Sequence, residues 1–313
     1  MTKRTPLERF AWLYLAYLFA VILFGAWVRI SGSGNGCGNH WPVCNGEILP
    51  TAPNVKTVIE FTHRLTSGLS GILGLVLLGW AWRKRAVHPW LFRAAAFSMF
   101  FLLLEAFIGA VLVKKELVAN DASASRALVV ALHLVNTMLL TATAATVAWL
   151  ASGRRSIATA RVAGAVWLLA MVAFILTNMT GAVTALGDTL FPVQPALNGD
   201  LWARVRDDLS ASQHFLVRLR LIHPLVAVST ALGTALLFLR LLLRKAGTLA
   251  QVGLGLVATQ VSLGLLNVAL AAPPWMQIVH LLVSQCLWVV VWLSVLSFWR
   301  QPALGRSGGS QAA

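Results

Sequence analysis

Long apolar runs separated by short polar segments make up most of the 313-residue chain. Eight runs reach the length of about 20 residues that a helix needs to cross a membrane. They lie at about 10–30, 57–82, 91–113, 127–150, 162–186, 215–243, 249–270 and 276–299. The first run is too long for the apolar core of a signal peptide and is kept as a helix. Because a backbone in lipid must satisfy its own hydrogen bonds, all eight are expected to be helical, and the pattern predicts an all-α integral membrane protein.

The composition agrees with this pattern. Hydrophobic residues make up 58% of the chain and charged residues 11%, well below the share of about 25% in soluble domains. A net charge of +15 would suit a nucleic-acid partner, but the basic residues occur in short clusters between the apolar runs. We therefore expect membrane lipid as the surroundings and no nucleic acid.

The basic clusters alternate along the chain and predict the orientation. Loops on one side carry 15 of the 25 basic residues and a single acid, Glu8; the bases are Lys3, Arg4, Arg9, Arg83, Lys84, Arg85, Arg93, Arg154, Arg155, Arg161, Arg240, Arg244, Lys245, Arg300 and Arg306. The positive-inside rule then places both termini in the cytoplasm, and we expect a bacterial plasma membrane as the location. Residues 301–313 have the composition of a flexible tail.

Two of the three cysteines, Cys37 and Cys44, lie in "NGCGNHWPVCNG" (35–46), which follows the first helix on the outer side. The outside of a bacterial membrane is oxidising, which favours a disulfide between them. A metal site that includes His40 is the alternative, although such a site needs more ligands. The third cysteine, Cys286, lies inside the eighth helix and is interpreted as an apolar filler.

Four of the seven histidines lie within the predicted spans, where ionisable residues are rare and usually functional. There is one on each even-numbered helix, one or two turns after its outer end: His63, His133, His223 and His280. Any one of them alone could be a histidine that hydrogen-bonds a neighbouring helix. Four at equal depth indicate metal ligands instead, and two imidazoles on facing helices can bind a haem iron from both sides.

The chain is also internally duplicated. "EAFIGAVLV" (105–113) matches "TQVSLGLLNV" (259–268), with Glu105 aligned to Gln260, and each match precedes a helix that carries a histidine. Four helices return the chain to its starting side, so the two halves run in the same direction. This predicts two pseudo-symmetric four-helix bundles, at 1–156 and 157–300, each with one histidine pair and room for one haem.

The halves differ next to the first histidine of each pair. "IEFTHRL" (59–65) places Glu60 three residues before His63, whereas "RLIHPLV" (220–226) has Arg220 at the corresponding position. Residues three apart share a helix face, so Glu60 is expected to face the haem pocket of the first half. The alternative is that Glu60 hydrogen-bonds a loop near the membrane surface. In the second half, Pro224 is expected to kink the sixth helix, because it cannot donate to residue 220.

The segments "FGAWVRISGSGNGC…WPVCNG" (24–46) and "IEFTHRLTSGLSG" (59–71), with the later histidines, resemble the haem A synthase family over nearly the whole chain. The resemblance implies oxidation of the C8 methyl of haem O to a formyl group, through successive hydroxylations, to give haem A for cytochrome c oxidase. It implies that His63 and His133 hold the substrate haem O and that His223 and His280 ligate a resident haem b. Glu60 would be the catalytic carboxylate, Arg64 would pair with a haem propionate, and Cys37 and Cys44 match the outer-loop pair of the family.

The resemblance further implies a haem O synthase as the upstream partner. The outer loop at 187–214 departs from some members of the family, because it has no cysteine pair. The residues leave two other classes open: a dihaem membrane cytochrome b that transfers electrons, and a transporter built from parallel repeats. They also leave open the electron acceptor and the formation of a homo-oligomer.

Overall fold

The computed structural model describes residues 4–153, 164–194, 197, 199–243 and 247–298. Within them, eight helical segments are long and apolar enough to cross a membrane. The elements are α1 (Pro6–Ile30), α2 (Val55–Arg83), α3 (Pro89–Lys114), α4 (Ala124–Ala151), α5 (Gly164–Leu190), α6 (Leu201–Asp208), α7 (Phe215–Leu219), α8 (Ile222–Leu243), α9 (Thr248–Ala269) and α10 (Pro274–Phe298). The predicted fold class, an all-α integral membrane protein, is confirmed.

The helix ends differ from the predicted runs by a few residues. α1 begins at Pro6, because Thr5 caps it by accepting a hydrogen bond from the Glu8 N–H at 3.1 Å. α5 continues to Leu190, past the predicted end at residue 186, and so includes the charged Asp188. The short α6 was not predicted; Asp200 caps it and accepts from the Ala203 N–H.

The sixth span is interrupted close to Pro224, where the sequence predicted a kink. α7 ends at Leu219, residues 220 and 221 form a turn, and α8 begins at Ile222. Pro224 lacks the N–H that would bond the carbonyl of residue 220, so the helix is weakest at this point. The break places Arg220 at the end of α7 with its side chain directed toward α5 and α6.

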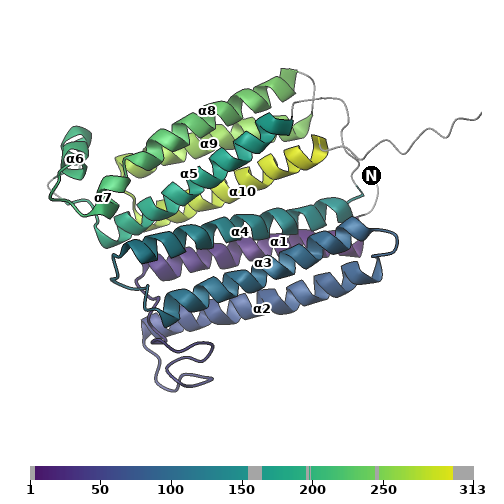
Figure 1. Ribbon diagram of the computed structural model, residues 1–313, viewed down its shortest axis with the longest axis horizontal. Coiled ribbons are helices and arrows are strands. Elements are labelled where there is room, and N and C mark those ends of the chain that lie inside the picture. Colours follow the sequence, from purple (N-terminus) through teal and green to yellow (C-terminus); the bar gives the residue numbers. More distant parts are fainter. Residues whose placement is uncertain (1–3, 154–163, 195–196, 198, 244–246, 299–313) are drawn as a thin grey trace, which may run out of the picture.

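The spanning helices form two groups of four, α1–α4 and α5 with α8–α10 (Figure 1). The fourth helix of each group, α4 or α10, is the most buried span of its half, and the two helices contact each other. Trp288 Nε1 donates to the Met138 carbonyl across this contact at 2.8 Å, and Trp292 Nε1 donates to Thr146 Oγ1. The two helix groups are thus joined by α4, which packs on both α10 and α5, and by a contact between α1 and α10.

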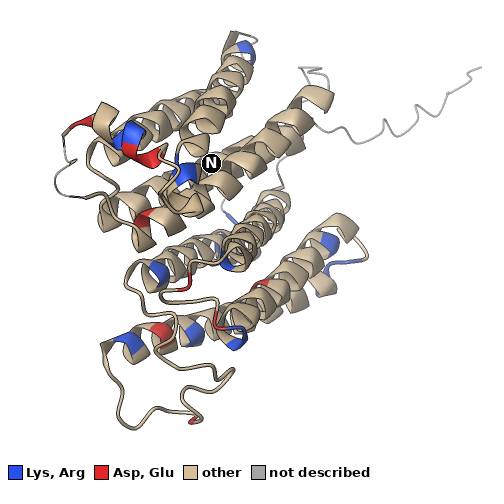
Figure 2. Ribbon diagram, turned by 60° about the vertical axis from the view of Figure 1, so that its left-hand side comes forward, with Lys and Arg blue, Asp and Glu red and all other residues tan. Residues whose placement is uncertain are grey.

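The disulfide loop, the α3–α4 connection and α6–α7 lie at one end of the molecule, and the N-terminal helix starts at the other end (Figure 1). Charged residues are concentrated toward the ends of the helices (Figure 2). The predicted boundary at 156–157, several of the basic clusters and the tail at 301–313 lie outside the described residues. The cytoplasmic placement of the termini stays a prediction.

Candidate functional site

The four span histidines lie in pairs, one pair in each helix group. His63 is on α2 and His133 on α4, while His223 is on α8 and His280 on α10. The two histidines of each pair lie on the second and the fourth spanning helix of their group. Each of the four lies within about three turns of the first residue of its span, and these four span ends lie at the end of the molecule where the disulfide loop is found. The four histidines therefore share a similar depth.

Glycines on neighbouring helices make room for these imidazoles. A Cβ atom at Gly25 of α1 would lie 3.1 Å from His63 Cε1, and one at Gly181 of α5 would lie 3.0 Å from His223 Cε1. A Cβ at Gly264 of α9 would lie 3.4 Å from His280 Cε1. Side chains at the first two positions would displace the histidine, so the close approach depends on glycine.

The hydrogen bonding of the histidines fits a role as iron ligands. The buried Nδ1 atoms of His63, His133 and His280 have no hydrogen-bond partner, although buried polar atoms are normally paired. His223 Nδ1 contacts Thr180 Oγ1 at 3.2 Å, and a hydrogen bond at the second ring nitrogen commonly orients a histidine that binds a metal. Three of the four imidazoles, those of His63, His223 and His280, lie against a glycine of a neighbouring helix. Each half thus has two histidines that could hold a haem iron, and this ligation stays a prediction.

Equivalent polar residues on the third helix of each half contact equivalent histidines. Glu105 Oε1 on α3 lies 3.3 Å from His133 Nδ1, outside hydrogen-bonding geometry, and accepts from Thr137 Oγ1 at 2.5 Å. Glu105 Oε2 also accepts from Asn136 Nδ2 at 2.5 Å. Gln260 on α9 places its amide nitrogen 3.1 Å from His280 Nε2. The aligned pair Glu105 and Gln260 therefore lies beside the second histidine of each half.

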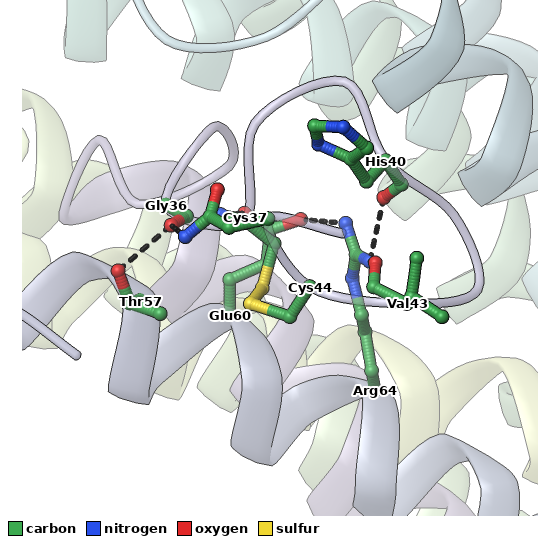
Figure 3. Close-up of polar contacts among 9 residues, drawn as sticks. Gly36, Cys37, His40, Val43, Cys44, Thr57, Glu60 and Arg64 are labelled. Carbon is green, nitrogen blue, oxygen red and sulfur yellow. Dashed lines mark hydrogen bonds and ion pairs between the residues drawn. A yellow bond between two sulfur atoms is a disulfide. The ribbon is translucent and has the colours of Figure 1, made fainter. Parts of the chain in front are cut away.

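Glu60 is buried, with 3% of its surface exposed, and both of its oxygens have partners (Figure 3). Oε2 accepts from the Cys37 N–H at 2.9 Å, and Oε1 accepts from Arg64 Nη2 at 2.5 Å. Glu60 therefore hydrogen-bonds a loop, as the sequence alternative had it, and its orientation toward a haem pocket stays a prediction. The loop in question is the disulfide loop, and the carboxylate still lies one helical turn before His63.

Cys37 and Cys44 form a disulfide, and both are completely buried. The loop that they close lies against the start of α2, where Thr57 Oγ1 donates to the Gly36 carbonyl at 2.7 Å (Figure 3). A Cβ at Gly36 would come within 2.3 Å of the Lys56 carbonyl oxygen, so only glycine fits this contact.

Arg64 connects this loop to Glu60. Its Nη1 donates to the carbonyls of His40 and Val43, at 2.8 and 2.7 Å, while its Nη2 bonds Glu60 (Figure 3). Both carbonyls belong to residues between the two cysteines. Pairing of Arg64 with a haem propionate stays a prediction.

Arg220, which occupies the position of Glu60 in the second half, is engaged elsewhere. It is buried, lies 3.1 Å from Asp188 Oδ1 and 3.6 Å from Asp208 Oδ1, and donates to the carbonyls of Gly187 and Phe191. Partial burial raises the pKa of Asp208 above its usual range, and the Arg220 charge opposes that rise. The second half therefore has a cation held by acids of α5 and α6 where the first half has a carboxylate.

The fold and the site define a membrane protein with one histidine pair in each of two similar helix groups. In the first group, the buried carboxylate of Glu60 lies one turn before the first histidine, and Glu105 lies beside the second. The chain belongs to the COX15-CtaA family, described as "Cytochrome oxidase assembly protein", whose profile matches residues 8–292.

The similar proteins fall under two different names. The chain is 44% identical over 292 residues to a "Protoheme IX farnesyltransferase" of Thermus thermophilus, a match that covers 91% of this chain and 47% of that protein. It is 40% identical over 90 residues to a "Heme A synthase" of Shouchella clausii, covering 29% of this chain and 30% of that protein. A "Heme A synthase" of Geobacillus kaustophilus is 46% identical over 96 residues, 31% of this chain and 30% of the relative. The chain thus spans about half the length of the Thermus protein, and its matches to the two synthases are local.

Proposed function

We propose that the protein is a haem A synthase, a membrane oxidoreductase that oxidises the C8 methyl of haem O to a formyl group. Its product would be haem A for cytochrome c oxidase. The family and the relatives named "Heme A synthase" support this proposal. The observation that carries it is the difference between the two halves. Glu60 of the first half is buried and fixed one turn before His63, whereas the matching position of the second half is Arg220.

The two histidine pairs would bind different haems. His63 and His133 would hold the substrate haem O, because their half contains Glu60. His223 and His280 would ligate a resident haem b, which when bound would supply one-electron redox chemistry. The packing of His63 on Gly25 and of His223 on Gly181 supports one haem in each half.

Glu60 would act on the reacting methyl carbon. Oxidation of a methyl group on a porphyrin builds positive charge beside the ring, or needs a water molecule directed at it. An oriented carboxylate in a site that excludes water stabilises such charge far better than one in bulk water. The contacts of Glu60 with Cys37 and Arg64 keep its carboxylate in one orientation before the substrate arrives.

The oxidation would proceed by two hydroxylations of the same carbon, each taking a hydroxyl group from water, releasing two protons and passing two electrons to the electron acceptor. The gem-diol then loses water to leave the aldehyde. The same methyl group must therefore stay beside Glu60 through both steps. Ligation by His63 and His133 from facing helices would keep the substrate in place between them.

The second half would pass electrons to an acceptor in the membrane. That half has Arg220 at the position of Glu60, and the carboxylates nearest to it, Asp188 and Asp208, lie beside the arginine. This asymmetry fits one haem that is changed chemically and one that only transfers electrons.

The surroundings of the protein follow from the same proposal. It would lie in the plasma membrane of a bacterium with both termini in the cytoplasm. A haem O synthase would supply its substrate. The Thermus relative bears a name that describes farnesylation of protohaem, which is the chemistry that yields haem O.

Extraction of haems tests the proposal. The full chain is expressed in cells that make no haem A, with and without a supply of haem O, and the extracted haems are separated by chromatography. We expect haem A only when both the protein and haem O are present. Bound haem b without haem A formation would contradict the proposal and favour an electron-transfer cytochrome.

A further inference from the structure

We infer that Arg64 and the disulfide-closed loop form a clamp that holds the Glu60 carboxylate, which makes Arg64 a positioning residue. This inference rests on the proposed function of Glu60. It gives Arg64 a role toward the proposed catalytic carboxylate beside the predicted pairing with a haem propionate, and it gives the disulfide a role beyond stabilising its loop.

Three residues on one face of α2 hydrogen-bond the loop. Thr57 bonds the Gly36 carbonyl, Glu60 accepts the Cys37 N–H, and Arg64 bonds two loop carbonyls. Their spacing of three and four residues places them in one row along the helix. The loop is therefore fixed to the same face that carries Glu60 (Figure 3).

The disulfide determines where the partners of Glu60 lie. Cys37 itself supplies the N–H that bonds Glu60 Oε2, and its carbonyl accepts from the Asn45 N–H at 3.0 Å. His40 and Val43, whose carbonyls hold Arg64, lie within the ring that Cys37 and Cys44 close. Opening the ring frees the Cys37 N–H, which is one partner of Glu60. It also frees the loop carbonyls that hold Arg64, which is the other partner.

Glu60 and Arg64 are both largely buried, so the loss of Arg64 changes the charge state of Glu60. The side chains of Glu60 and Arg64 are only 4% and 13% exposed. Removal of one member of a buried ion pair leaves an uncompensated charge, which a carboxyl group avoids by taking up a proton. Two contacts leave about half of the acceptor sites of the carboxylate free, so a clamped Glu60 can still face a water molecule or the substrate.

Carbodiimide labelling tests the clamp without relying on haem A formation. An apolar carbodiimide reacts with protonated carboxyl groups in membranes, and mass spectrometry of the α2 peptide measures modification of Glu60 in the intact protein. Modification of Glu105, a carboxylate on α3 of the same helix group, serves as an internal reference. We expect Glu60 to be protected in the native protein and its labelling to rise about tenfold or more in Arg64→Gln, because its charged partner is lost.

The disulfide arm covers the case in which Arg64→Gln does not fold. Reduction of the native protein, or the double change Cys37→Ser with Cys44→Ser, should raise Glu60 labelling in the same direction. Arg64→Lys should give an intermediate value, because a single ammonium group cannot match the fork that reaches both Glu60 and the loop.

The matched control is Arg126→Gln. Arg126 is also buried and also bonds loop carbonyls, those of Ala119 and Asp121, but these belong to the α3–α4 connection. Its replacement should leave Glu60 protected.

The two possible failures are distinguishable. Unchanged Glu60 labelling in both Arg64→Gln and the reduced protein would overturn the clamp, whatever the haem content. Increased labelling together with normal haem A formation would support the clamp and contradict the catalytic role proposed for Glu60.

Discussion

Single residues determine how closely the histidines approach the neighbouring helices. Gly25 and Gly181 lie on the first helix of each half, each is followed by alanine, and each lies against the first histidine of its pair. The recurrence of Gly-Ala in the two helices is a sequence signal of the repeat, but only the contacts reveal its purpose. Haem occupancy should therefore depend on these glycines as well as on the histidines.

Gly181→Ala should lower the resident haem content while leaving the helix intact. Its Cβ would lie 3.0 Å from His223 Cε1, so the imidazole must move. Alanine is favoured over glycine within a helix by about 0.5 to 1 kcal/mol, so loss of haem cannot be ascribed to a weaker helix. The measurement is haem per protein after purification, with Gly233→Ala on α8, which has open space around it, as the control. Equal haem content in both variants would refute this role of Gly181.

His223→Ala and His280→Ala should each remove the resident haem b, because an iron held by two imidazoles loses one of its ligands. Absorption spectra of the purified variants, with protein yield as the measure of folding, provide the test. Retention of the full haem b complement in both variants would exclude this ligand pair.

Among the elements, the disulfide loop and α2 act as one unit. Three α2 side chains hold the loop, and the loop in turn supplies a partner for Glu60. The sixth span shows the opposite behaviour, since the break before Pro224 frees Arg220 to meet Asp188 and Asp208. The matching positions of the two halves thus have different partners: Glu60 contacts the disulfide loop and Arg64, and Arg220 contacts Asp188 and Asp208.

Thiol labelling in denaturant without a reductant should modify Cys286 alone, because Cys37 and Cys44 are joined. The double change Cys37→Ser with Cys44→Ser should reduce haem A formation more than protein yield. A ring of this size contributes about 2 to 3 kcal/mol in the chain-entropy model, which is small beside the packing of eight spanning helices. Labelling of all three cysteines of the unmodified chain under these denaturing, non-reducing conditions would show that the bridge is absent.

The sequence allowed prediction of those features that depend on residues near one another in the chain. Apolar runs predicted the eight spans, and Pro224 predicted the break in the sixth. The short α6 was missed because its polar sequence has no apolar run. The contacts of Arg64 with the His40 and Val43 carbonyls were also missed, because every residue has a carbonyl group and none marks itself as a partner. Helix periodicity placed Glu60 near His63, but the folding of the loop determines its direct partners.

At the scale of the molecule, the two halves meet through the equivalent helices α4 and α10, together with contacts of α4 with α5 and of α1 with α10. α4 and α10 are each the last helix of their half, and indole nitrogens of α10 bond α4 twice. Association of helices in lipid relies on packing and hydrogen bonds, because lipid is as apolar as the side chains. Trp288, which is 1% exposed, is therefore expected to matter for holding the halves together.

Trp288→Phe should lower thermal stability in detergent by about 1 kcal/mol, the typical value of a hydrogen bond between membrane helices. The ring packing is largely kept, while the bond to the Met138 carbonyl is lost. Size-exclusion profiles of heated samples give the midpoint of unfolding. Trp275→Phe on the same helix, where the side chain is 58% exposed, is the control and should shift the midpoint less. Equal shifts would mean that the interface bond contributes nothing.

The most direct test of the whole account is chromatography of haems extracted from cells whose only copy of the protein carries Glu60→Gln. Glutamine keeps the size of the side chain and can still accept from the Cys37 N–H, but it lacks the charge that would stabilise the reacting carbon. We predict normal protein yield, haem bound in both halves, little or no haem A, and accumulation of haem O or its hydroxylated form. Haem A at the normal level in these cells would contradict the account, because Glu60 would then be a structural residue.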